Sequence, residues 1–191
     1  MLSRSEFLKK SAQLACGTCA ATILGSSNSH AAEAADKTPT PVDEALKKAQ
    51  YENTFTKNWM ADLFAAIDTD LEPAAKLKLM EACGRGCFNR HKFKQDIAEA
   101  GKGDVDKLVE AYRTNYGIKR EGNLVHISYG GGCYCPAAWN RAIRPNDLHC
   151  ECTRFTHETI FRAALGRHVP VEVVESIRRG GQKCHLIAHL S

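Results

Sequence analysis

Between residues 40 and 67 the apolar positions recur at the spacing of an α-helix. Thr40 offers a capping hydroxyl, Pro41 suits a first turn, and acidic side chains follow, which is the usual composition of a helix start. The pattern predicts one long helix, or two in succession, with one buried stripe made of Leu46, Ala49, Trp59, Met60, Leu63, Phe64 and Ile67. A stripe of methionine and aromatic residues is typical of a protein core, so we assign it no function.

Further helices are predicted up to residue 117. The helical pattern restarts after Asp70 and ends near Gly84. Because Gly84 and Gly86 each cost about 1 kcal/mol in a helix interior, we expect a break there, with the next helix covering Cys87 to Ala100. A fourth helix is expected from an aspartate cap at 104 to a glycine stop at 117.

The carboxy-terminal half changes to the period of β-strands. Residues 124–129 alternate between apolar and polar, and a helix is expected over 154–165. Residues 169–177 are rich in β-branched side chains, and 182–190 alternate again after a glycine turn, which predicts a terminal β-hairpin. The expected fold class is α+β, with amino-terminal helices packed on an antiparallel sheet that ends in a carboxy-terminal β-hairpin.

The length and the first residues predict one exported domain. A chain of 191 residues suits a single domain after a removable segment. Residues 1–31 combine early basic residues, an apolar run and small residues at the cleavage positions, the layout of an export signal. Its start resembles a twin-arginine signal, with Ser5 in place of the second arginine. We expect a linker at 32–40, a single Cys-rich α+β domain at 41–191, and a periplasmic or cell-envelope location. The alternative is a retained amphipathic helix that uses Cys16 and Cys19 as a thiol pair.

The charge balance argues against nucleic acid as a partner. The formal net charge is +4, and removing the three cations and one anion of the signal leaves +2. A chain so balanced, without a basic stripe or an RNA-binding aromatic signature, has little electrostatic attraction for phosphate backbones. No run of about 18 uncharged apolar residues occurs, so we expect no transmembrane segment in the mature chain. The sequence does not indicate the oligomeric state.

Nine cysteines are the unusual feature of the composition, and seven remain if the signal is removed. Two C-x-C pairs stand at Cys133/Cys135 and Cys150/Cys152. In an extended segment such residues point to one side with Cα atoms about 7 Å apart, roughly the limit for a disulfide. Two facing pairs could instead offer four sulfurs to one zinc ion, although structural zinc sites favour longer spacing.

A third group consists of Cys83, Cys87 and His91. On one continuous helix the three would share a face, whereas a break would place Cys87 at a helix start, where the positive helix end lowers a thiol pKa. Cys87 is therefore a candidate metal ligand or reactive thiolate. The alternative is that Cys83 and Cys87 are buried thiols or form a disulfide.

The predicted metal ligands are Cys83, Cys87, Cys133, Cys135, Cys150 and Cys152. Zinc is the expected metal if one is bound, and an iron–sulfur cluster is the alternative. Cys184 is expected in the core, and His149 is the histidine most relevant to the site because it adjoins Cys150. Glu175 lies in an apolar strand, so its carboxylate needs a partner or faces water. The candidate catalytic residues are Cys87, His91 and Glu175.

The end of the chain resembles the 4-vinyl reductase type of ligand-binding domain. Cys150-Glu151-Cys152 is followed by a helix, by a strand carrying Glu175, by a turn at Gly180, and by Cys184 at the start of the last strand. Cys133-Tyr134-Cys135-Pro136 with the same ending is also similar to the L-2-amino-thiazoline-4-carboxylic acid hydrolase family. The resemblance covers about residues 120–190. Ser176 and Ile177 replace a further cysteine of the former pattern, and Leu186 replaces an aromatic residue.

The resemblance implies a pocket between helices and an antiparallel sheet for a small, largely apolar or heterocyclic ligand. Glu175, Gly180 and Cys184 would occupy family positions in it. We therefore expect an exported small-molecule-binding or hydrolytic domain built around a cysteine-rich metal site, with hydrolysis of a carbon–nitrogen bond of a heterocycle as its enzymatic version. The alternatives are a disulfide-stapled binding protein without catalysis and a thiol redox protein that uses Cys87.

Overall fold

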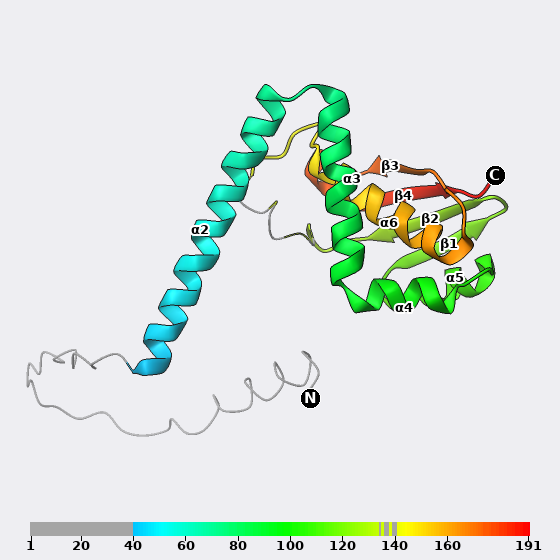
Figure 1. Cartoon of the computed structure of the whole chain (residues 1–191), viewed down its shortest axis with the longest axis horizontal. Coiled ribbons are helices and arrows are strands. Elements are labelled where there is room, and N and C mark those ends of the chain that lie inside the picture. Colours follow the sequence, from blue (N-terminus) through cyan, green and yellow to red (C-terminus); the bar gives the residue numbers. More distant parts are fainter. Residues whose placement is uncertain (1–39, 134, 136–137, 139–140) are drawn as a thin grey trace, which may run out of the picture. The chain divides into compact units, whose positions relative to one another are not determined.

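The computed structural model describes residues 40–133, 135, 138 and 141–191, and residues Thr40–Ser191 form one compact unit. The export signal predicted at 1–31, the alternative role of Cys16 and Cys19, and nearly all of the predicted linker lie outside the described residues. Within them, helices pack with a four-stranded antiparallel sheet (Figure 1), which confirms the predicted α+β fold class.

The first described helix, α2, spans Pro41–Asp70 and begins as predicted. The Thr40 hydroxyl accepts a hydrogen bond from the Asp43 N–H at 3.2 Å, and the Asp43 carboxylate accepts one from the Thr40 N–H at 3.0 Å. The prediction of one buried stripe along this helix is wrong. Only Phe64 and Ile67 are buried, because they join a small core with Met80 and Leu148, while the apolar side chains nearer the helix start are exposed.

Helix α3, Pro73–Arg90, runs without interruption through both glycines, so the predicted break is wrong. Close packing against helix α6, His149–Leu165, explains the difference. A Cβ atom at Gly84 would lie 2.7 to 2.9 Å from atoms of α6, which leaves room for glycine alone. The chain breaks instead at His91, whose backbone is extended.

Helices α4, Lys92–Ala100, and α5, Val105–Tyr112, follow. The Asp104 carboxylate caps α5 as predicted by accepting the N–H groups of residues 106 and 107. The predicted extension of this helix to residue 117 is wrong, because α5 ends at Tyr112 and a strand that the pattern did not show begins at Gly117.

The sheet has the order β1-β2-β4-β3 with every neighbouring pair antiparallel. Its strands are β1 Gly117–Glu121, β2 Leu124–Tyr129, β3 Val171–Glu175 and β4 Cys184–His189. The predicted terminal hairpin is confirmed: β3 and β4 pair, and a short 3-10 helix, Ile177–Arg179, lies in their connection. Inward residues of the central strands β2 and β4 form the main core with α4, α5 and α6: Val125, Ile127, Leu186 and Ala188.

Candidate functional site

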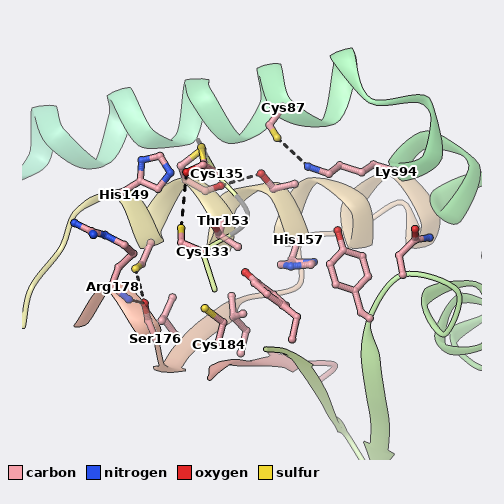
Figure 2. A pocket seen from close by; sticks show the side chains of 18 of the residues that line it. Cys87, Lys94, Cys133, Cys135, His149, Thr153, His157, Ser176, Arg178 and Cys184 are labelled. Carbon is pink, nitrogen blue, oxygen red and sulfur yellow. Dashed lines mark hydrogen bonds between the residues drawn. The ribbon is translucent and has the colours of Figure 1, made fainter. Parts of the chain in front are cut away.

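A cavity of about 380 Å³ is lined by residues of α3, α4, α6, the loop around residue 133, and the strands β2, β3 and β4. Figure 2 shows cysteine sulfurs from several of these elements around it. Six of the seven described cysteines line the cavity, namely Cys87, Cys133, Cys135, Cys150, Cys152 and Cys184, while Cys83 is exposed. The fold therefore brings cysteine residues that are distant in sequence to the wall of one cavity.

The two cysteines of the second C-x-C pair face different surroundings. Both lie in the first turns of α6, so the extended conformation considered for them is wrong, and they project about 200° apart around the helix. The Cys150 Sγ lies 2.8 Å from the Ser176 hydroxyl. Burial, followed by the influence of Cys83, Cys87 and Cys135, raises the pKa of the Cys152 thiol to about 12. The α6 helix thus separates Cys150, toward Ser176, from Cys152, toward α3.

Burial also raises the pKa of the thiols of Cys150 and Cys184. These thiols and that of Cys152 are therefore protonated at neutral pH. Cys184, predicted as a core residue, is buried at the start of β4 and faces the cavity.

The described residues contain no group of three or more histidine, cysteine, aspartate or glutamate side chains placed to hold a metal ion. The thiols share one cavity, but their arrangement is not that of a ready tetrahedral site. A metal held by the six predicted cysteines would require their side chains to move, so zinc and an iron–sulfur cluster stay predictions.

Cys87 lies in the last turn of α3, so its predicted place at a helix start, and the effect of the positive helix end, are wrong. The Lys94 ammonium of α4 lies 2.8 Å from the Cys87 Sγ (Figure 2). The His91 Nδ1 lies 2.6 Å from the Cys87 carbonyl oxygen and 3.7 Å from its sulfur. Two of the three candidate catalytic residues thus meet, together with a lysine that the sequence analysis missed because the bend at His91 brings it close.

Glu175 lines the cavity, and its carboxylate accepts hydrogen bonds from the N–H groups of Gln182 and Lys183 at 2.8 and 3.2 Å. These two bonds hold the pKa of the Glu175 carboxyl below its usual value. The partners of this carboxylate are therefore two backbone N–H groups in the connection between β3 and β4. Its catalytic role stays a prediction.

A buried ionic network lies near the opposite end of the cavity from Cys87, where Figure 2 shows His149 and Arg178. The Asp147 carboxylate, 1% exposed, accepts hydrogen bonds from Arg141 at 3.2 Å and from Arg178 at 2.9 Å. It also accepts the His149 N–H at 2.9 Å. Burial lowers the pKa of His149 to about 4, so its imidazole is neutral at pH 7. Sequence reasoning missed this network, although an aspartate two residues before His149 is a capping signal.

His157 is a second buried histidine on the cavity wall. Its Nδ1 lies 3.2 Å from the Tyr112 hydroxyl, and burial lowers its pKa to about 3. The site therefore contains neutral imidazoles, protonated thiols and one close pair of lysine and cysteine.

In the part of the chain that the structure describes, no helix has the length and apolar character needed to cross a membrane. No curated protein matches the sequence. The fold is similar to the crystal structure of a trafficking protein particle complex subunit 3 from Naegleria fowleri covalently bound to palmitic acid, at 12% identity and a TM-score of 0.47. That match covers 74% of this chain and 96% of the other, and a similarity of this size carries no functional inference. The model of a family of unknown function, DUF6144, matches residues 22–190, so the chain belongs to that family.

Proposed function

We propose that this protein binds a small organic molecule in the thiol-lined cavity. The observation that carries the proposal is the convergence of six cysteines on one cavity of about 380 Å³. Ligand pockets commonly measure about 300 to 1,000 Å³ and combine an apolar lining with a few polar groups. This cavity fits a small ligand at the lower end of that range.

The wall of the cavity supports a largely apolar or heterocyclic ligand. Tyr116, Tyr129, Val173 and Leu186 contribute aromatic and aliphatic surface, and sulfur atoms are polarisable partners for aromatic rings. Two basic groups of the lining lie apart, with Lys94 near Cys87 and Arg178 near His149 (Figure 2), and the Glu175 carboxylate also lines the cavity. A ligand with an apolar body and a polar end matches this wall.

The exported location and the hydrolytic activity are part of this proposal. The location rests on the sequence of residues 1–31, and hydrolysis of a carbon–nitrogen bond rests on the family resemblance of residues 120–190. We derive no catalytic step through a metal, because no ligand set is arranged for one among the described residues.

A pair of neighbouring substitutions in β3 tests ligand binding. Val173 faces the cavity, whereas the adjacent Val174 is 48% exposed, so Val173→Trp fills the cavity and Val174→Trp is its matched control. We expect the native protein and the Val174→Trp protein to show saturable fluorescence with Nile red, and the Val173→Trp protein to lose most of it. Circular dichroism checks that both variants are folded. Equal binding by the two variants would refute the cavity as the binding site.

A metal-containing version is the second candidate, and the same convergence of thiols favours it. Metal analysis of protein purified without chelator, together with native mass spectrometry, should then find one zinc or iron centre per chain. Its loss in a Cys133→Ser/Cys135→Ser protein would support ligation by these thiols. Metal-free protein whose cysteines map as three disulfides would instead support the stapled binding protein.

A further inference from the structure

Two histidines meet on the side of the sheet opposite the main core. Val125, Ile127 and Leu186 point into that core, so the alternate residues His126 and His185 point to the other side. The His126 Nδ1 lies 3.1 Å from the His185 Nε2, and the two rings are stacked with their centres 5.3 Å apart. Neither histidine lines the cavity described above, so the pair is separate from the cysteines.

The pairing of strands β2 and β4 fixes the two rings side by side. These strands are the central pair of the sheet (Figure 1), and Ile127 is the register partner of Leu186. His126 and His185 are therefore diagonal neighbours, with Cα atoms about 7 to 8 Å apart, a distance that two aromatic side chains span. The paired backbone thus holds both imidazoles within reach of one ligand.

The separation of the two nitrogens suits a metal ion. An imidazole nitrogen binds zinc at about 2.0 to 2.1 Å, so two such bonds at an angle of about 90 to 110° place the nitrogens about 2.9 to 3.4 Å apart. The distance of 3.1 Å between the His126 Nδ1 and the His185 Nε2 falls within this range. Imidazole nitrogens are preferred ligands of zinc, nickel and copper, which defines the class of ion.

The Glu121 carboxylate on β1 lies next to the outer nitrogen of His126. The His126 Nε2 is buried, makes no hydrogen bond to the described residues, and lies 3.6 Å from one Glu121 oxygen. The other Glu121 oxygen lies 2.5 Å from the Lys119 ammonium, so each oxygen has its own neighbour. Because a carboxylate only accepts hydrogen bonds, it favours the tautomer with the proton on Nε2 and the lone pair on Nδ1. A carboxylate in this position typically orients a metal-binding histidine.

We propose that His126 and His185 chelate a divalent transition-metal ion through Nδ1 and Nε2, respectively, with water in the remaining positions. Both rings bind as neutral imidazoles: His126 keeps its proton on Nε2, and His185 carries its proton on Nδ1. Glu121 is a positioning residue that acts through His126. The site has two protein ligands, which agrees with the lack of a group of three or more among the described residues. The inference does not rest on the proposed function of the cavity.

Cobalt(II) locates the ion, because it is paramagnetic and perturbs the NMR signals of nearby amides. Full-length reduced protein is titrated with cobalt chloride at about pH 7.5, where ordinary imidazoles are mostly neutral. We expect amide signals around His126 and His185 to shift or broaden, and zinc in excess to reverse the effect. Cobalt bound to cysteines would instead perturb α3 and α6 and add sulfur-to-metal absorption in the near ultraviolet. Unchanged signals around the two histidines at high cobalt overturn the inference, whether or not the cysteines respond.

Variants separate a chelate from two independent histidines. We expect His185→Gln to abolish the cobalt response around His126, and His126→Gln to abolish the response around His185. His189→Gln is the matched control, because His189 lies on the same strand but pairs with Glu172 at 3.5 Å, and it should leave the response unchanged. Circular dichroism checks the fold of each variant. A response around His126 that persists in a folded His185→Gln protein overturns the chelate.

The role of Glu121 is tested through affinity. We expect Glu121→Ala to weaken cobalt binding at the two histidines by about tenfold or more, as is typical when the carboxylate behind a metal-binding histidine is removed. Glu172→Ala, which removes the carboxylate beside His189, should leave the dissociation constant unchanged. Equal dissociation constants for the native and Glu121→Ala proteins would show that Glu121 does not position His126.

Discussion

The two glycines of α3 offer a matched test of how this helix packs. At Gly84 a Cβ atom would lie 2.7 Å from the Phe155 Cβ, 2.8 Å from the Thr156 nitrogen and 2.9 Å from the Cys152 oxygen. Two of these atoms belong to the backbone of α6 and cannot turn away. At Gly86 the nearest atoms, at 3.1 to 3.5 Å, are those of the flexible Arg90 guanidinium. Alanine therefore fits at position 86 and not at position 84.

The magnitudes follow from two opposing effects. Replacing glycine by alanine inside a helix stabilises it by about 1 kcal/mol, because less backbone entropy is lost on folding. Overpacking a close contact costs about 1 to 3 kcal/mol, and a contact with backbone falls at the upper end because whole helices must separate. We expect Gly84→Ala to lower the free energy of unfolding by about 2 kcal/mol and Gly86→Ala to raise it by about 0.5 to 1 kcal/mol.

Urea unfolding followed by circular dichroism at 222 nm measures both values, provided that the transition is two-state. The melting temperatures of the two variants should differ by roughly 4 to 12 °C for a domain of this size. The residues that a Cβ atom at Gly84 would contact include Cys152 and Thr156, which line the cavity. Gly84→Ala should therefore also weaken Nile red binding. A Gly84→Ala protein at least as stable as the native one would refute the close contact between α3 and α6.

Three further predictions concern buried polar groups. Asp147→Asn removes the anion between Arg141 and Arg178 and should lower the free energy of unfolding by about 3 to 5 kcal/mol in urea at pH 7. The difference from the native protein should shrink in acid, as the native carboxyl becomes protonated below its ordinary pKa of 3.8. An unchanged free energy of unfolding would contradict the network. Burial keeps His149 and His157 neutral in the folded protein, with pKa values of about 4 and about 3. In the unfolded chain both histidines bind protons below about pH 6.5. The free energy of unfolding should therefore fall as the pH drops from about 6.5 toward 4, by up to about 1.4 kcal/mol per pH unit for each histidine. The slope should decrease in a His157→Gln protein, and an equal slope would contradict burial of a neutral imidazole. Tyr112→Phe removes the hydroxyl beside His157 and should cost about 0.5 to 1.5 kcal/mol, whereas Tyr51→Phe on the exposed part of α2 should cost nothing measurable.

Helix starts and the terminal hairpin could be predicted because they depend on local chemistry. Thr40 and Asp104 cap helices through hydrogen bonds to the next few residues, and the alternation in 182–190 requires only that one face of a strand be buried. The strand β1 was missed because its residues are mostly exposed and show no alternation. The break expected at Gly84 was wrong because a contact with α6, some 70 residues later, outweighs the local cost of glycine.

The sequence by itself determined that this chain makes an α+β domain rich in cysteine, since capping groups, strand alternation and composition act over a few residues. Only the tertiary structure decided that six of those cysteine residues line one cavity, that Cys150 and Cys152 project from different sides of α6, and that Lys94 contacts Cys87. The physical reason is that these positions depend on how helices and sheet pack together, through close contacts such as that at Gly84, between segments that no local pattern connects.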